Sequence, residues 1–135
     1  MKKIILSAFI FVMTMTTNTF ADIKMGIILG FTGPIESLTP AMAASAELAF
    51  KEASDSGSLL GGKKISVERA DSTCVDSAAA TSAAEGLVSG GVVAIMGADC
   101  SGVTGAIAKN VAVPNGVVMI SPSATSPGLT DLKDN

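Results

Sequence analysis

The loop that follows the last apolar run of the chain is dense in hydroxyl groups. Residues 119–130 read Met-Ile-Ser-Pro-Ser-Ala-Thr-Ser-Pro-Gly-Leu-Thr, so the apolar run at 117–120 leads directly into Ser123 and Thr125, between Pro122 and Pro127. Hydroxyl and free backbone groups can hydrogen-bond a small polar ligand, and the prolines lower the entropy cost of ordering the loop. This composition predicts a small polar-ligand site, and an ordinary Ser/Pro-rich connection is the alternative.

A second candidate loop, Gly97-Ala-Asp-Cys-Ser-Gly102, lies between an apolar run and an expected helix. Ser101 would lie near the helix N-terminus, where unpaired amides and the helix dipole favour an anion. Its hydroxyl could donate to a carboxylate or could cap the helix. Asp99 could orient an ammonium group, cap the helix or stay solvated. If this loop lies beside Ser123 and Thr125, a convergent polar pocket is the better interpretation of Ser101.

The elements that must position these loops follow from the alternation of apolar and amphipathic runs. The carboxylate of Asp76 is expected to cap the second helix. The run at 92–96 is apolar throughout, which is typical of a central strand buried on both faces, and the run at 117–120 is also expected to be buried. The expected strands are 23–29, 64–69, 92–96 and 117–120, and the expected helices are 41–53, 76–89 and 101–111. This order predicts an α/β fold with a parallel sheet, whose strand ends place ligand loops at one edge.

The N-terminus has the layout of a secretory signal peptide. Lys2 and Lys3 precede the apolar segment 4–15, and small residues at 19 and 21 favour cleavage before Asp22. Residues 1–21 are therefore predicted to be a signal peptide, with an uncleaved anchor as the alternative. Residues 22–135 are expected to form a soluble domain in the periplasm of a bacterium, with no cysteine at the cleavage site for lipid attachment.

Two cysteines, Cys74 and Cys100, each follow an expected strand at the same end of the sheet. An even pair in an exported chain predicts a disulfide, and two free thiols are the alternative. The bond would contribute about 3 kcal/mol in the chain-entropy model. It would also tie the loop at 71–76 to the loop that carries Ser101, so it could be a structural staple, a support for the site, or both.

Several function classes find no support in the sequence. The chain has no His, so a Ser-His-Asp arrangement is absent, and no G-x-S-x-G, P-loop or G-x-G-x-x-G motif occurs. Metal sites and cofactors are not expected. The net charge of −3 and the lack of Trp, Tyr and a basic stripe argue against binding nucleic acid. The chain is therefore expected not to be an enzyme.

Four segments together resemble the periplasmic binding proteins of branched-chain amino acid ABC transporters. They are Thr32-Gly-Pro34 after the first strand, Asp71-Ser-Thr-Cys74 after the second, the 97–101 loop, and the 120–130 motif. The resemblance covers residues 22–135. The family has two α/β lobes that close on a ligand, so the resemblance implies that residues 22–135 are the incomplete N-terminal ligand-binding lobe of a longer protein. A self-sufficient one-lobe domain is the alternative.

The resemblance also implies roles for individual residues. Ser101 would bind the ligand's α-carboxylate through its hydroxyl, and Ser123 would offer its backbone carbonyl to the α-ammonium. Thr125 would use its hydroxyl and amide on the same head group, with Ala124 between the two. Cys74 and Cys100 match the positions of a disulfide found in some members.

Near Leu38 the chain departs from the family pattern. Amino-acid-binding members often carry an aromatic residue there, whereas this chain reads Glu36-Ser-Leu-Thr39, which leaves the selectivity for the ligand side chain open. Relatives of this fold also bind aliphatic amides, urea or aromatic acids. The expected function is a periplasmic receptor that delivers a small amino acid, branched-chain or similar, or a related carboxylate, to the membrane permease of an ABC transporter. A ligand-sensing domain of a signalling receptor and an exported α/β hydrolase fragment are the alternatives.

Overall fold

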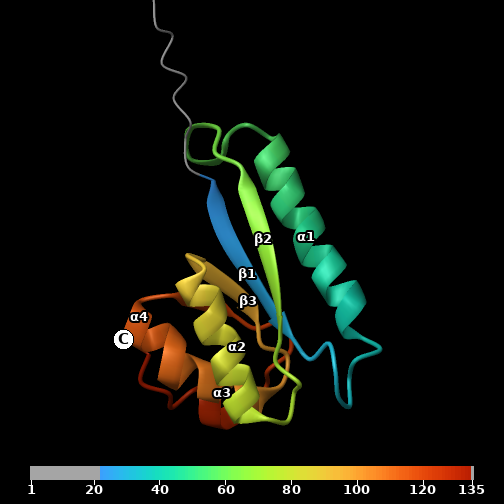
Figure 1. The fold of residues 1–135 in the computed structure, drawn as a ribbon, viewed down its shortest axis with the longest axis vertical. Helices are drawn as coiled ribbons and strands as arrows, with labels where there is room; N and C mark the ends of the chain where they lie inside the picture. The colour runs from blue at the N-terminus through green and yellow to red at the C-terminus, as the bar shows by residue number, and fades with distance from the viewer. Residues whose placement is uncertain (1–21, 135) are drawn as a thin grey trace, which may run out of the picture.

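The computed structural model describes residues 22–134, which form a four-stranded parallel sheet with helices on both faces (Figure 1). The spatial order of the strands is β2-β1-β3-β4. The strands are β1 (Ile23–Leu29), β2 (Ile65–Asp71), β3 (Ala94–Gly97) and β4 (Val118–Ile120). The helices are α1 (Thr39–Asp55), α2 (Ser77–Ser89) and α3 (Ser101–Ile107), and α3 continues through a π-helical turn (Ala108–Ala112) into α4 (Val113–Asn115). The predicted α/β fold with a parallel sheet is confirmed, and the predicted signal peptide lies outside the described residues.

Strand β1 lies at the centre of the sheet and contributes to a core on each face. Ile28 points to the face covered by α2 and α3, whereas Ile27 and Leu29 point to the face covered by α1 (Figure 1). This alternation follows from the two-residue period of a strand. The first core is the larger, and its buried members are Ile28, Ala80, Ala84, Leu87, Val92, Ile95, Ala98, Val103, Ile107 and Val111.

Helix α2 begins at the cap predicted from the sequence. Asp76 has an extended backbone, and its carboxylate accepts hydrogen bonds from the amides of Ala78 and Ala79, at 2.9 and 3.0 Å. These bonds satisfy two of the amides that have no partner within the first turn of a helix. The cap therefore fixes the point at which the loop after β2 becomes helical.

The prediction that the fourth strand is buried is wrong. Strand β4 pairs only with β3 and forms one edge of the sheet. The side chains of Val118 and Ile120 are 63% and 70% exposed. The reason is that α1 packs over β1 and β2, so within residues 22–134 no helix covers this face of β4.

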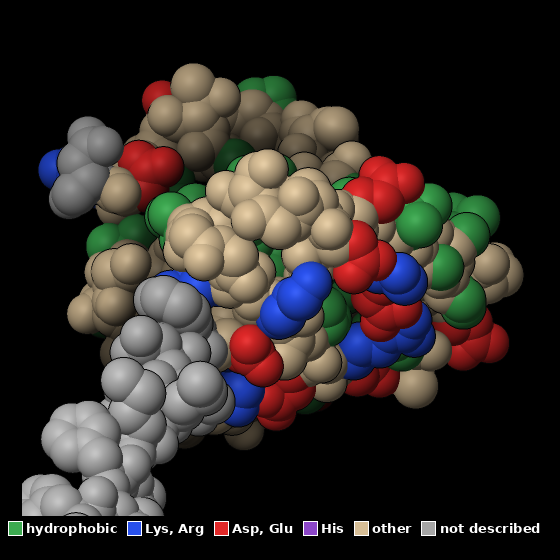
Figure 2. Space-filling view, turned by 90° about the horizontal axis from the view of Figure 1, so that it is seen from above, with side chains coloured by type: hydrophobic (Ala, Val, Ile, Leu, Met, Phe, Trp, Pro, Cys, Tyr) green, Lys and Arg blue, Asp and Glu red, His purple; other side chains and the backbone are tan. Residues whose placement is uncertain are grey.

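Charged side chains of both signs gather at the end of the molecule opposite the loops that follow the strands (Figure 2). Figure 2 views the end at which β1 enters the sheet, and there Lys and Arg side chains lie among Asp and Glu side chains. Lys24 lies 4.0 Å from Glu68, and Lys64 lies 3.9 Å from Asp55. Exposed pairs of this kind add little stability. Their mixed signs leave this face without the basic patch that a nucleic acid would require.

Gly97 ends β3 in a conformation that requires glycine. Its φ angle is +131°, and a Cβ atom built on it would lie only 1.9 Å from the carbonyl oxygen of Ile28 in β1. Side chains other than hydrogen are strained at such positive φ values. The glycine therefore allows β3 to approach β1 closely at the point where the chain turns into the Ala98–Ser101 loop.

A disulfide joins Cys74 to Cys100, with their Cα atoms 5.2 Å apart. Cys74 follows β2 and Cys100 follows β3, and β1 lies between these two strands. The bond therefore passes over the carboxyl end of β1, where a Cβ atom on Gly30 would lie 3.2 Å from that of Cys74. The predicted disulfide is confirmed, and it connects two of the loops that carry candidate site residues.

Replacing Gly97 with alanine is expected to lower the free energy of unfolding by about 3 kcal/mol or more, because β1 and β3 would have to separate. Urea denaturation measures the change. Gly86→Ala in α2 is the control, because a Cβ atom there meets nothing within 4 Å. That control should gain up to about 1 kcal/mol from helix propensity. A Gly97→Ala variant as stable as the wild type would contradict the conclusion that the close approach of β3 to β1 requires glycine at this position.

Replacing both cysteines with alanine is expected to lower the free energy of unfolding by about 3 kcal/mol, because the bond restricts the unfolded chain. The same urea titration is run on the oxidised wild type and on the double variant. As a control, a reducing agent should destabilise the wild type by a similar amount and leave the variant unchanged. Equal stability of the oxidised and reduced wild type would show that the bond adds nothing.

Candidate functional site

The loops that follow the four strands meet at one end of the sheet. The carboxyl ends of parallel strands share an edge, which is the usual place for ligands in this class of fold. The loops comprise residues 30–38 after β1, 72–76 after β2, 98–100 after β3 and 121–126 after β4. All of the candidate site residues lie in these loops or directly after them.

Ser101 and Thr125, which the sequence placed in one pocket, are in direct contact. The Ser101 Oγ atom accepts hydrogen bonds from the amides of Thr125 and Ser126, both at 3.1 Å. The interpretation of Ser101 as a helix cap is wrong, because Ser101 is the first residue of α3 and its Oγ atom binds the loop after β4. Within residues 22–134 the Ser101 hydroxyl donates no hydrogen bond, so its proton is available to an acceptor such as a carboxylate.

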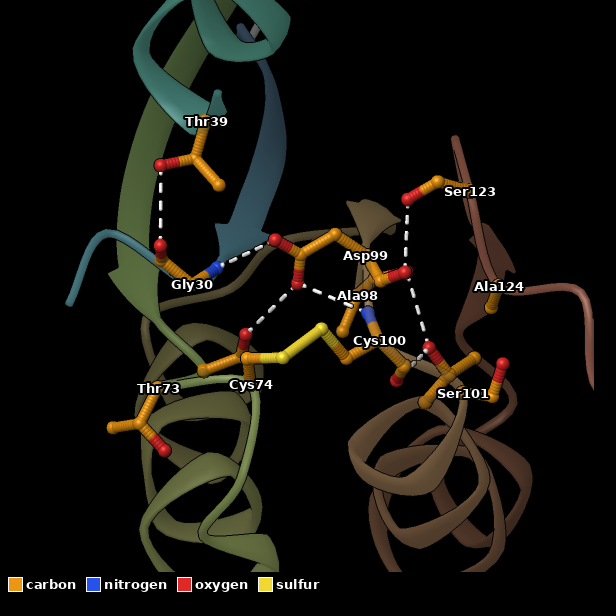
Figure 3. Close-up of a disulfide and its surroundings, with 12 residues drawn as sticks. Gly30, Thr39, Thr73, Cys74, Ala98, Asp99, Cys100, Ser101, Ser123 and Ala124 are labelled. Carbon is orange, nitrogen blue, oxygen red and sulfur yellow. Dashed lines mark hydrogen bonds between the residues drawn. A yellow bond between two sulfur atoms is a disulfide. The ribbon is translucent and has the colours of Figure 1, made fainter. Parts of the chain in front are cut away.

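In the loop after β4, two serine side chains hold the loop in place and the Thr125 side chain stays exposed. Ser123 Oγ donates to the carbonyl oxygen of Asp99 at 2.8 Å, so this hydroxyl joins the loops after β4 and β3 (Figure 3). Ser121 donates to the carbonyl oxygen of Ala98 and accepts from the amide of Ala124 at 2.8 Å. Thr125 itself is exposed. Ser121 did not emerge from the sequence as an anchor, although its position directly after a strand and before Pro122 was a usable signal.

Asp99 lies beneath the loops and is only 3% exposed. Its Oδ2 atom accepts from the amide of Gly30 at 2.9 Å, and its Oδ1 atom accepts from the amide of Cys100 at 3.1 Å and from Ser72 Oγ at 3.2 Å (Figure 3). The interpretation of Asp99 as a solvated side chain is therefore wrong. Its carboxylate is surrounded by donors from the chain itself.

The loop after β1 is held at two further points. Thr39, which is fully buried, donates from Oγ1 to the carbonyl oxygen of Gly30 at 3.1 Å. Thr32 Oγ1 donates to Asp71 Oδ2 at 2.6 Å, and the amide of Thr73 donates to Asp71 Oδ1 at 2.8 Å. Partial burial raises the pKa of Asp71, but the hydrogen bonds from Thr32 and Thr73 outweigh this effect and hold the pKa below its usual value. Asp71 is thus an ionised acceptor at neutral pH.

Leu38, the position expected to face a ligand side chain, directly precedes α1 and is 55% exposed. Its side chain makes no buried core contact in the part of the chain that the structure describes. The structure thus leaves this side chain free to contact a ligand, as an apolar aliphatic group rather than an aromatic one.

The site is open on its outer side. A cavity of about 570 Å³ lies beside the edge strand and is lined by residues such as Thr104, Met119 and Leu129, and neither Ser101 nor Thr125 lines it. Ser123 and Thr125 are exposed, so the hydroxyls and amides around Ser101 lie at the surface of residues 22–134. Among residues 22–134, no group of three His, Cys, Asp or Glu side chains could hold a metal ion, and no helix is long and apolar enough to cross a membrane.

Several curated proteins with similar sequences have names that describe amino-acid binding. The chain is 34% identical over 110 residues to the Leu/Ile/Val-binding protein BraC3 of Rhizobium johnstonii, which covers 82% of this chain and 29% of that protein. It is 33% identical over 109 residues to the leucine-specific-binding protein of Salmonella typhimurium, with coverage of 81% and 29%. The chain therefore spans about 30% of the length of these relatives.

Solved structures show the same similarity in three dimensions. The branched-chain amino acid transporter substrate-binding protein LivJ from Streptococcus pneumoniae, in complex with isoleucine, matches with a TM-score of 0.73 and 36% identity, over 82% of this chain and 31% of that one. An ABC transporter substrate-binding protein from Desulfitobacterium hafniense, in complex with Leu, matches with a TM-score of 0.71 and 29% identity, over 84% and 32% of the two chains.

The sequence model of one family, described as periplasmic binding protein, matches residues 22–133, which is most of the chain. The parallel sheet, the loops at its carboxyl edge and the relatives found by sequence and by structure agree with this match. The chain belongs to the periplasmic binding protein family.

Proposed function

We propose that this chain is part of a receptor that binds a small amino acid or a related carboxylate and delivers it to the membrane permease of an ABC transporter. The names of the relatives support the ligand class, since they are Leu/Ile/Val-binding and leucine-specific-binding proteins. Among the solved relatives, one structure contains isoleucine and another contains Leu. A branched-chain aliphatic amino acid is therefore the ligand to test first.

The observation that carries this proposal is the arrangement around Ser101. Two backbone amides donate to its Oγ atom, both at 3.1 Å. An oxygen that accepts two hydrogen bonds becomes a stronger donor, because chains of hydrogen bonds polarise one another. The free proton of Ser101 is thus well suited to bind a carboxylate. The Thr125 hydroxyl would contribute a second contact, and the carbonyl oxygen of Ser123 would accept from the α-ammonium group.

The side chain of the ligand would lie against small or aliphatic groups. Leu38 is the exposed apolar residue at the end of the loop after β1, and Ala124 adds little bulk beside Thr125. These residues suit an aliphatic side chain better than a polar one, because polar atoms placed against them would lose hydrogen bonds to water.

Residues 22–135 would form part of the N-terminal lobe of this receptor, with residues 1–21 as its signal peptide and the periplasm as its location. The open surface around Ser101 would require a second lobe to enclose the ligand by hinge closure. The receptor would be soluble and would bind its ligand without converting it, as membership of the periplasmic binding protein family implies.

In the complete receptor, Ser101→Ala is expected to weaken the binding of L-leucine by about 1.5–3 kcal/mol, the value of a hydrogen bond to a charged group. Thr125→Ala should weaken binding in the same direction. Isothermal titration calorimetry measures both changes, and thermal unfolding shows whether each variant is folded.

Ser45→Ala is the matched control, because the Ser45 hydroxyl donates only to the carbonyl oxygen of Ala41 within α1, at 2.9 Å. This variant should bind L-leucine like the wild type. A folded Ser101→Ala variant with unchanged affinity would refute the assignment of the carboxylate site.

A further inference from the structure

The ends of all four strands are linked through one buried residue, Asp99. Its carboxylate accepts from the amide of Gly30 after β1 at 2.9 Å and from Ser72 Oγ after β2 at 3.2 Å. Its backbone carbonyl accepts from Ser123 Oγ after β4 at 2.8 Å. Asp99 itself lies in the loop after β3, so it joins the loops of β1, β2 and β4 to its own (Figure 3).

The surroundings of Asp99 favour a carboxylate over any other side chain of this size. The three groups directed at it, Gly30 N–H, Cys100 N–H and Ser72 O–H, are all donors. A carboxylate only accepts, and each oxygen can take two bonds. In an asparagine, an NH₂ group would replace one of the two carboxylate oxygens and would face the donors that this oxygen accepts from. At least one of those donors would then be buried without a partner.

The loops pack closely around this carboxylate. A Cβ atom on Gly30 would lie 3.4 Å from Asp99 Oδ2 and 3.2 Å from the Cβ atom of Cys74. Ser72 is fully buried, and the next residue after Asp99, Cys100, is held by its disulfide to Cys74. A change in these hydrogen bonds must therefore displace the loops themselves.

We propose that Asp99 is the positioning residue of the ligand site, acting through the loops it joins rather than by touching the ligand. It holds the loop after β1, which leads to Leu38, at a fixed distance from Ser101 and Thr125, which follow β3 and β4. The two parts of the site are then ordered before the ligand arrives, so less conformational entropy is lost on binding. This inference rests on the proposed function for its effect on affinity, but its effect on the loops can be measured without a ligand.

The first test is amide hydrogen exchange on the full chain carrying Asp99→Asn, with no ligand present. Exchange of the Gly30 amide should become about tenfold faster or more, the change that corresponds to about 1.4 kcal/mol. Exchange at Ala84, in the centre of α2, should be unchanged. Leu87→Ala is the control, because it removes a core side chain that is 2% exposed and should accelerate exchange at both positions.

The second test is the affinity of the complete receptor for L-leucine by calorimetry. Asp99→Asn should bind about tenfold more weakly, whereas Leu87→Ala should bind like the wild type while it remains folded. Faster exchange at Gly30 combined with unchanged affinity would overturn the positioning role, and so would a uniform increase in exchange throughout the chain. If the wild-type receptor does not bind L-leucine, the proposed ligand is wrong, and the exchange experiment alone then decides whether Asp99 orders the loops.

Ser72→Ala is the second variant in case Asp99→Asn does not fold. It removes one of the three donors and leaves the carboxylate with two bonds, so the chain should remain folded. Exchange in the loops at 30–32 and 72–74 should accelerate, and affinity for L-leucine should fall by about threefold, a smaller loss than for the carboxylate itself. No change in either quantity would overturn the proposal.

Discussion

Where a parallel strand ends, its backbone groups lose the partners that the sheet supplied. Buried groups of this kind must find other partners, because an unpaired donor or acceptor away from water is costly. In this protein the side chains of the following loops supply them. The carbonyl oxygen of Ala98 accepts from Thr104 and Ser121, that of Gly30 accepts from Thr39, and the amide of Gly30 donates to Asp99. Within residues 22–134, every buried side-chain nitrogen or oxygen has a hydrogen-bond partner.

This requirement explains why the edge of the sheet is so rich in Ser, Thr and Asp. Such residues fall into two groups that look alike in the sequence. The inward group, represented by Ser121, Ser72 and Thr39, completes the backbone bonds of the strand ends. The outward group, Ser101 and Thr125, keeps hydroxyl groups on the surface. The first group makes the second group rigid, so a site of this kind is built from more polar residues than would ever touch a ligand.

The sequence predicted the strands, the helices and the Asp76 cap, because each depends on a local pattern of residues. It predicted the disulfide because the chain has two cysteines and is expected to be exported to an oxidising compartment. It also predicted that Ser101 and Thr125 would lie together, since both follow strands of one parallel sheet. It did not predict the exposure of Val118 and Ile120. An apolar run indicates that a strand prefers to be covered, but the position of α1 decides which strands are covered. Nor could it identify Asp99 as a buried junction, since that depends on four segments distant in the sequence meeting at one point.

The strand order also bears on how this protein can reach its oxidised form. Cys74 and Cys100 follow strands that are not neighbours, because β1 lies between them. In the folded protein the two sulfur atoms lie together because β1 pairs with both β2 and β3 and so fixes the distance between the loops that carry them. The folded sheet therefore favours this bond, since it holds the two thiols closer together than a flexible segment of 26 residues would. By the same thermodynamic coupling, the bond should be harder to reduce in the folded protein than in the unfolded chain.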